Sequence, residues 1–178
     1  MTDFAIRPAV AADLASIQRI YSHHVLTGLA SFEETPPDIL ELTRRWQAIA
    51  QAGLPYVVAE APDGAIAGYA YAGPYRPRSA YRFTVEDSIY LDPSFQGRGL
   101  GRALLARLIA DATACGKRQM IAVIGDSANL ASIGVHRALG FEMTGTFKAI
   151  GLKFGRWVDT VLMQRALGDG ASQTPTNE

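Results

Sequence analysis

The sequence predicts an α/β fold built on a mixed β-sheet in a single domain. Short segments rich in β-branched and aromatic residues alternate along the chain with longer segments whose apolar residues recur at helical spacing. Two of the short segments flank an Asp63-Gly64 turn, which is typical of an antiparallel hairpin. Two others, residues 85–91 and 120–124, are separated by a glycine-rich loop and a helix, the order that pairs strands in parallel.

The composition excludes several classes of protein. Hydrophobic residues make up 48% of the 178 residues and charged residues 19%, which is typical of a globular domain. Lys plus Arg and Asp plus Glu both number 17, so no net charge favours nucleic acid or a membrane surface. Residues 1–5 do not resemble a signal peptide, and Cys115 is the single cysteine, interpreted as a packing residue. We therefore expect a cytoplasmic protein without a disulfide or a metal site.

The N-terminal third is predicted to contain one strand and two helices. Residues 5–7 form the short strand, and Asp13 is expected to cap the first helix. A loop follows, with Phe32 as its expected buried anchor. The second helix starts after Asp38 and ends at Gly53. The apolar faces that predict the helices are Leu14, Ile17, Tyr21 and Val25 in the first and Ile39, Leu42, Trp46 and Ile49 in the second.

The rest of the chain is predicted to alternate strands and helices. A loop rich in Tyr and Arg, from Gly73 to Arg82, leads to the central strand. The connection between the last two strands is expected over residues 151–156. Small and polar residues predict a mobile tail over 168–178, after a domain spanning 1–167. The expected strands are residues 56–60, 66–72, 85–91, 120–124, 141–146 and 157–163, and the expected helices are residues 103–114 and 129–140.

The glycine-rich loop after the central strand is the strongest functional signal. It reads QGRGLGR over residues 96–102 and leads into a helix. The first turn of a helix carries unpaired N–H groups and partial positive charge, and glycines let the backbone approach a ligand, so the loop favours phosphate oxygens. The Lys and hydroxyl residue of a Walker loop are absent, and the glycine spacing does not match a dinucleotide-binding loop. The alternative is a tight turn between strand and helix.

The loop resembles the Gln/Arg-x-x-Gly-x-Gly/Ala signature of the GNAT N-acetyltransferases, which binds the pyrophosphate of acetyl-CoA. The predicted element order from Ile6 to Leu167 is also that of the GNAT fold. The resemblance implies a mixed, mostly antiparallel sheet with helices on both faces and a splayed parallel central pair. Within this superfamily, four segments are similar to phosphinothricin and methionine sulfoximine acetyltransferases: residues 71–76, 84–88, 123–125 and 153–157.

The resemblance implies acetyl-CoA as co-substrate and assigns residues to it. The pantetheine arm would pair with exposed backbone of the central strand, and the pyrophosphate would lie on the glycine loop. Asn129 would contact the arm, although its alternative role is that of a plain helix N-cap. The residues assigned in this way are Ile89, Tyr90 and Leu91 for the arm, Gly97, Arg98, Gly99, Leu100, Gly101 and Arg102 for the pyrophosphate, and Asn129 with Ser132 on the following helix.

Two residues are the candidate catalytic groups. Glu86 lies where the family places a carboxylate that deprotonates the amine, and partial burial would raise its pKa for that task. The alternative for Glu86 is a solvated residue or the ion-pair partner of an Arg. His136 holds the position at which many GNATs carry a Tyr that protonates the coenzyme thiolate, and the alternative is a core or capping histidine. A backbone N–H near residues 89–91 would stabilise the oxyanion.

The remaining assignments concern the acceptor. A substrate carboxylate needs fixed positive charge, and Arg76 and Arg78 are the candidates, with Tyr81 lining the pocket and Arg82 and Lys153 in reserve.

The leading hypothesis is acetyl transfer to the α-amino group of a small amino acid or analogue. The alternatives are another amine, such as a polyamine, an aminoglycoside or a peptide N-terminus, and a non-catalytic acyl-CoA-binding module. A cationic acceptor would need an acidic cleft, and the Arg-rich loop argues against one. His23 and His24 are interpreted as surface or substrate-cleft residues. The family resemblance further implies a homodimer.

Overall fold

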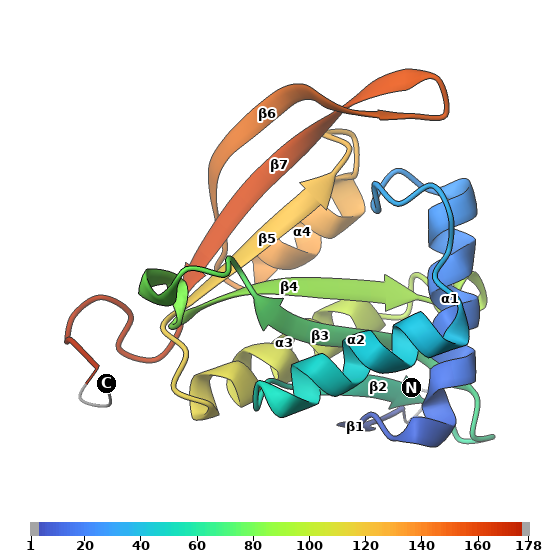
Figure 1. Cartoon of the computed structure of the whole chain (residues 1–178), viewed down its shortest axis with the longest axis horizontal. Helices are drawn as coiled ribbons and strands as arrows, with labels where there is room; N and C mark the ends of the chain where they lie inside the picture. Colours follow the sequence, from blue (N-terminus) through green and yellow to red (C-terminus); the bar gives the residue numbers. More distant parts are fainter. Residues whose placement is uncertain (1–3, 176–178) are drawn as a thin grey trace.

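A mixed sheet of seven strands forms the centre of the computed structural model, which describes residues 4–175 (Figure 1). The strand order across this part of the chain is β1-β2-β3-β4-β5-β7-β6. Only β4 and β5 are parallel neighbours among them, and every other pair is antiparallel, as predicted. The strands are β1 (Ala5–Pro8), β2 (Tyr56–Glu60), β3 (Ile66–Pro74), β4 (Thr84–Leu91), β5 (Gln119–Gly125), β6 (Glu142–Lys153) and β7 (Arg156–Ala166).

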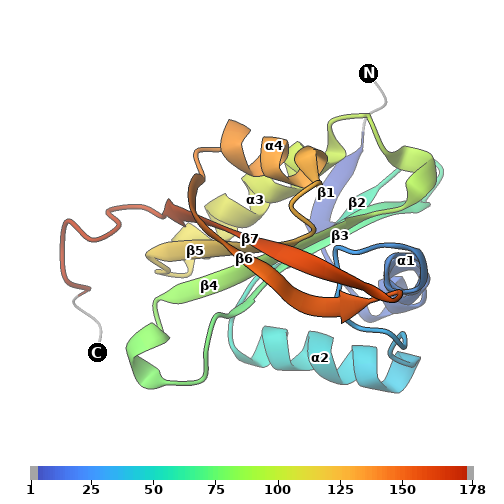
Figure 2. The ribbon, with the colours of Figure 1, turned by 90° about the horizontal axis from the view of Figure 1, so that it is seen from above.

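Helices cover both faces of the sheet, which confirms the expected GNAT arrangement (Figure 2). On one face lie α1 (Leu14–Thr27) and α2 (Ile39–Gln51), whose apolar residues pack with the tyrosines of β2 and β3. On the other face lie α3 (Leu100–Ala114) and α4 (Leu130–Ala138), which cover the larger of the two cores. Helices therefore pack against both faces of the sheet at β4, one strand of the parallel pair.

The start of α1 differs from the expectation. Asp13 does not cap the helix with its side chain. Its carboxylate accepts hydrogen bonds from Arg7 at 2.7 and 2.9 Å and from the backbone N–H of Val10 at 2.8 Å. Arg7 on β1 binds both oxygens of this carboxylate, which therefore does not cap the N–H groups of α1, because charge-assisted hydrogen bonds are stronger than neutral ones. The second helix begins after Asp38 as predicted, and the Asp38 side chain caps it by accepting from the N–H of Glu41 at 2.8 Å.

The last two strands are longer than predicted and form one extended hairpin. The expected connection over residues 151–156 is reduced to a tight turn at Phe154 and Gly155, with φ of +51° and +72°. The sequence hides this turn because Phe is a poor residue for a positive φ. Phe32 is not buried as expected, since 43% of it is exposed. Its ring instead lies against Gly151, where an added Cβ would sit 2.4 Å from the ring.

The C-terminal segment is described to residue 175. Within it, Asp169 pairs with Arg118 at 2.9 Å, and the N–H of Gly170 donates to the carbonyl of Leu167 at 2.9 Å. Residues 176–178 of the tail predicted to be mobile lie outside the described residues. No helix in residues 4–175 has both the length and the apolar character that crossing a bilayer requires.

Candidate active site

The parallel strands β4 and β5 separate half-way along their length. Their pairing runs from Thr84 opposite Gln119 to Asp87 opposite Ala122 and then stops. Beyond that rung β4 continues beside β3, and β5 continues beside β7, so the two strands diverge (Figure 1). The splayed central pair is therefore confirmed. Divergence also explains why Val123 is 39% exposed although a fully buried strand was expected over residues 120–124.

The backbone of β4 faces two directions in alternation. The N–H of Tyr75 donates to the carbonyl of Thr84, and the N–H of Asp92 donates to the carbonyl of Ala67, so even-numbered residues of β4 bond to β3. Odd-numbered residues, Ile89 and Leu91 among them, therefore direct their backbone groups toward the gap.

Of the three residues assigned to the pantetheine arm, Tyr90 is the one whose backbone turns away from the gap. Its ring packs against Tyr21 on α1, with centroids 5.0 Å apart. The Leu91 carbonyl accepts a hydrogen bond from the His24 ring at 2.7 Å, so His24 joins α1 to the end of β4. Burial lowers the pKa of His24, in keeping with a neutral ring that donates to a carbonyl.

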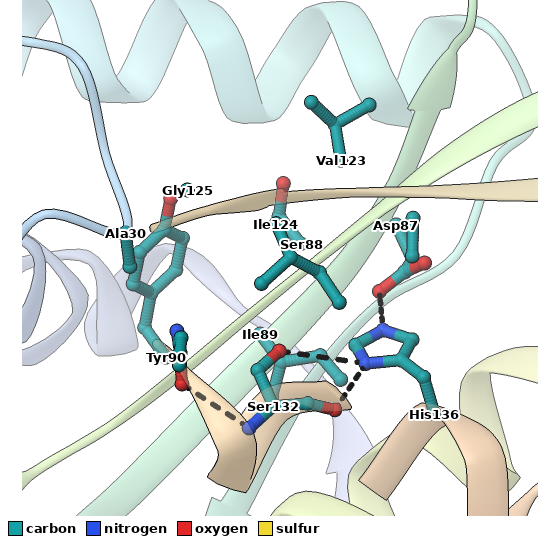
Figure 3. A pocket seen from close by; sticks show the side chains of 12 residues that line it. Ala30, Asp87, Ser88, Ile89, Tyr90, Val123, Ile124, Gly125, Ser132 and His136 are labelled. Carbon is teal, nitrogen blue, oxygen red and sulfur yellow. Dashed lines mark hydrogen bonds and ion pairs between the residues drawn. The ribbon is translucent and has the colours of Figure 1, made fainter. Parts of the chain in front are cut away.

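A narrow cavity of about 60 Å³ occupies the gap (Figure 3). Side chains from β4, β5 and α4 line it, including Ile89, Asn129 and Ser132, which the sequence assigned to the coenzyme. Ala30, from the loop after α1, closes one end, and no sequence signal had indicated it. The Asn129 Oδ1 accepts from the N–H of Ser132 at 3.2 Å, so Asn129 caps α4 while also lining the cavity.

The glycine loop leads directly into the N-terminus of α3. Gly97 and Gly99 have φ of +74° and +78°, which only glycine adopts without strain, and Gly99 is the N-cap residue. Apart from the adjacent residues in the chain, no atom of residues 4–175 lies within 4 Å of the position that a Cβ would take on either residue. Arg98 stacks over Phe95 at 5.2 Å, and Arg102 is exposed in the first turn of α3. Open space, helix N–H groups and two guanidinium groups together suit a diphosphate.

Glu86 lies at the start of the gap, half-buried on the face of β4 that α1 and α2 cover. Burial and the neighbouring charge of Asp87 raise its pKa, while Arg76 opposes the shift. Among the described residues no ion pair involves Glu86, so its expected alternative as the bonded partner of an Arg is not what the structure contains. A carboxylate with a raised pKa is a better proton acceptor.

His136 lies on the opposite face of β4, buried at the base of the cavity. Its Nε2 is 2.9 Å from Oδ2 of Asp87, and its Nδ1 donates to the Ser132 carbonyl at 2.8 Å. Burial alone would lower the pKa of His136, but the hydrogen bond and charge of Asp87 outweigh it and raise the pKa. Sequence reasoning missed Asp87, although strand alternation places it on the face opposite Glu86 and therefore toward α4.

The acceptor candidates occupy the loop between β3 and β4. The Arg76 guanidinium lies 5.2 Å from the ring centre of Tyr75. Its charge acts to lower the pKa of Glu86, so the two side chains are close enough to interact. Arg78 is exposed, and Tyr81 packs edge-on against Tyr75 with centroids 5.5 Å apart. Two guanidinium groups and an aromatic surface therefore lie on one loop beside Glu86.

The reserve candidates have other partners. Arg82 stacks over Phe83 at 4.8 Å. Lys153 is 1% exposed, and its Nζ donates to the Ser31 carbonyl at 2.6 Å, so it fastens the hairpin to the loop after α1. Burial lowers the pKa of Lys153. His23 packs edge-on against His24. Residues 4–175 contain no group of three or more His, Cys, Asp or Glu that could hold a metal ion.

A splayed parallel strand pair, a glycine loop that leads into a helix N-terminus and a half-buried carboxylate on the central strand are the features of an acyltransferase of the GNAT type. The sequence model of the Acetyltransferase (GNAT) family matches residues 17–141. The chain belongs to this family.

Its relatives narrow the comparison further. The chain is 56% identical over 163 residues to the phosphinothricin N-acetyltransferase of Alcaligenes faecalis, covering 92% of this chain and 82% of that one. It is 42% identical over 167 residues to the L-methionine sulfoximine/L-methionine sulfone acetyltransferase of Salmonella typhimurium, covering 94% and 96%. A phosphinothricin acetyltransferase from Sinorhizobium meliloti, solved with acetyl-CoA, superposes with a TM-score of 0.96 at 55% identity, covering 99% and 95%.

Proposed function

We propose that the protein transfers the acetyl group of acetyl-CoA to the α-amino group of a small amino-acid analogue of the phosphinothricin or methionine sulfoximine type. The observation that carries this proposal is the open edge of β4, which begins after Asp87, next to the half-buried Glu86, and leads to the glycine loop at α3. The names and the identities of the relatives support the choice of substrate.

The described residues fit acetyl-CoA as the acyl donor. Backbone groups of Ile89 that face the gap can pair with the amides of pantetheine, as a peptide pairs with a sheet edge. The N-terminus of α3, with Gly97, Arg98 and Arg102, can hold the diphosphate. Ser132 lines the cavity between these regions. The donor supplies an activated acyl group as a thioester, and the chain supplies its binding and orientation.

Glu86 is proposed as the base that takes protons from the amine, directly or through water. An α-ammonium group must lose a proton before its nitrogen can attack the thioester carbonyl. Burial raises the pKa of Glu86, and this makes its carboxylate a stronger proton acceptor. A backbone N–H of β4 that faces the gap, such as that of Ile89, can stabilise the oxyanion. His136 is proposed as the source of the proton that the leaving thiolate receives.

Acceptor recognition is proposed for the loop beside Glu86. Arg76 and Arg78 would pair with the substrate carboxylate, and Tyr81 would line the pocket. This basic loop suits an anionic amino-acid analogue better than a polyamine or an aminoglycoside, because like charges repel.

We also propose a homodimer and a cytoplasmic location. The edge strand β6 and its partner β7 expose an apolar surface of a kind that single subunits rarely leave open. A second copy of the same hairpin would cover it, and sedimentation of the wild type against a Trp157→Glu variant tests this. The residues of that surface are Met143, Phe147, Ile150, Leu152, Phe154 and Trp157. The free and exposed Cys115 suits a reducing compartment.

A coenzyme-thiol release assay tests the function. The amines are phosphinothricin, methionine sulfoximine, spermidine and an aminoglycoside, each with acetyl-CoA. We expect release with the first two. Release with the cationic amines alone would overturn the substrate assignment, and coenzyme binding without release for any amine would indicate a non-catalytic module.

A further inference from the structure

Asp87 and His136 form a buried pair at the last rung of the β4–β5 ladder. Asp87 lies opposite Ala122 in that rung, and His136 comes from α4. Both side chains are almost fully enclosed, with 3% and 4% of their surfaces exposed. The second carboxylate oxygen of Asp87 is buried and makes no hydrogen bond within residues 4–175, so His136 is the only side chain there to which Asp87 bonds. The hydrogen bond to Asp87 therefore fixes the position of the His136 imidazole ring.

The geometry determines where the ring keeps its protons. The Ser132 carbonyl can only accept a hydrogen bond, so the Nδ1 of His136, 2.8 Å away, carries a proton. The Nε2 faces a carboxylate at 2.9 Å, and this contact favours a second proton on the ring. Asp87 is the charged group that acts on His136 among the described residues, and the ring of Phe141, which packs edge-on against the imidazole, is uncharged. The ring is therefore held as an imidazolium.

This arrangement leaves neither ring nitrogen free to touch a coenzyme sulfur in the gap. Ser132 lines the same cavity as His136, and its Oγ is 3.4 Å from Nδ1 (Figure 3). A distance of 3.4 Å is long for a hydrogen bond, but catalytic hydrogen bonds commonly tighten only when substrate binds. Ser132 can turn its hydroxyl toward either Nδ1 or the gap.

We propose that the Ser132 hydroxyl protonates the leaving coenzyme thiolate, that His136 replaces the hydroxyl proton, and that Asp87 positions the ring and keeps it charged. This proposal rests on the acetyltransferase function proposed above. It gives Asp87 a positioning role and gives Ser132 a catalytic one, in addition to contact with the coenzyme. It also makes His136 act through Ser132 and not directly.

The protons balance over one turnover. When the C–S bond breaks, its electron pair stays on sulfur, the Ser132 Oγ–H proton moves to that sulfur, and the Nδ1 proton of His136 moves to Oγ. The ring keeps the Nε2 proton that faces Asp87. The amine loses two protons through Glu86, and one proton from solvent restores the imidazolium, so one proton is released overall. The Nδ1 lone pair would otherwise face the Ser132 carbonyl, and this repulsion favours reprotonation.

Exchanging the leaving atom of the donor tests the relay. Acetyl-CoA and its selenoester analogue acetyl-seleno-CoA carry the same acyl group, but a selenolate is a much weaker base than a thiolate and leaves without a proton. The variants are Ser132→Ala, Asp87→Asn and His136→Gln, with Ser132→Thr as the matched control that keeps a hydroxyl. With acetyl-CoA we expect kcat of the first three to fall about 100-fold. The KM for acetyl-CoA should change little, and Ser132→Thr should retain most activity.

The selenoester decides between a relay and a structural role. We expect the losses of the first three variants to shrink to a few-fold with acetyl-seleno-CoA. Equal losses with both donors, or full activity of Ser132→Ala with acetyl-CoA, would overturn the proposal. If the two buried variants fail to fold, the Ser132→Ala and Ser132→Thr pair still decides it, because Ser132 is only partly buried. A wild type that acetylates no amine with either donor would refute the proposed function itself.

Discussion

The two faces of β4 place neighbouring carboxyl groups in opposite environments. Glu86 points to the side of α1 and α2, half-buried and without an ion pair among the described residues, whereas Asp87 points to the side of α4 and is bonded to His136. Strand alternation alone separates these groups across a single peptide bond. Glu86 on one face can thus accept a proton, and His136 on the other face can supply one. Neighbouring titratable groups in different environments are a usual source of acid and base roles.

The largest effect should come from removing the carboxylate of Glu86, the proposed proton acceptor. In Glu86→Gln the amide cannot take a proton from the amine, so we expect kcat to fall by about 10²–10⁴-fold with unchanged affinity for acetyl-CoA. Thiol release and calorimetric titration measure the two quantities. Glu142→Gln, an exposed change on the edge strand β6, is the matched control and should have wild-type kinetics. Loss of coenzyme affinity in parallel with kcat would indicate a structural role for Glu86 and would break the comparison.

The next effect concerns the loop that closes the gap at the end of β5. A Cβ added to Gly125 would lie 2.3 Å from the Leu29 carbonyl oxygen, so Gly125→Ala must displace backbone. We expect a loss of about 1–3 kcal/mol in the free energy of unfolding, measured by urea titration, and a lower kcat. Gly145→Ala, on β6 with nothing within 4 Å of the added Cβ, is the control. A stable Gly125→Ala variant with normal kinetics would contradict this prediction, because it would show that the loop at Leu29 can move without loss of stability or activity.

Local features of the site were readable from the sequence, and contacts between distant segments were not. The glycine loop and the Asn129 cap follow from residues next to one another, and both are where the sequence placed them. The contact between Asp87 and His136 joins residues 49 positions apart, so it depends on how α4 packs over β4. Asp13 shows the same limit, because Arg7 from a different element takes the carboxylate that local propensity assigned to a helix cap.

The fold was predictable for a related reason. Apolar periodicity, the Asp63-Gly64 turn and the order of strands and helices are all local signals, and they predict the elements and the antiparallel pairing of β2 with β3. The long hairpin of β6 and β7 was underestimated, because its turn places Phe154 at a positive φ where sequence rules expect Gly or Asn. Such a turn is stabilised by strand pairing along the whole hairpin. A short window of sequence does not contain the residues that make this pairing.

The pH dependence of the free energy of unfolding should reveal the Asp87–His136 pair on the α4 side of β4. Asp87 raises the pKa of His136 above its value near 6.5 in the unfolded chain, so the pair stabilises the fold fully below that pH. This contribution is lost as pH rises through the raised pKa, at about 1.4 kcal/mol for each unit of difference. Asp87→Asn should abolish this component in urea titrations, and Asp169→Asn, in an exposed ion pair, should not. Parallel profiles for the wild type and Asp87→Asn would contradict the assignment.

The smallest effect should lie on the Glu86 face and involve charge alone. Arg76 lowers the pKa of Glu86 against the larger effect of burial, so Arg76→Gln should raise that pKa further. Because the base must be ionised, the acid limb of kcat/KM should move to higher pH, and this shift is measured separately from any fall of the plateau caused by weaker acceptor binding. Arg76 is exposed and water screens its charge, so the displacement should be a fraction of a pH unit. Arg44→Gln is the matched control, because Arg44 is exposed on α2 and is not among the charges that act on Glu86. A limb that moves equally in both variants would mean that overall charge sets it, and a limb that stays fixed in Arg76→Gln would mean that it reports a group other than Glu86.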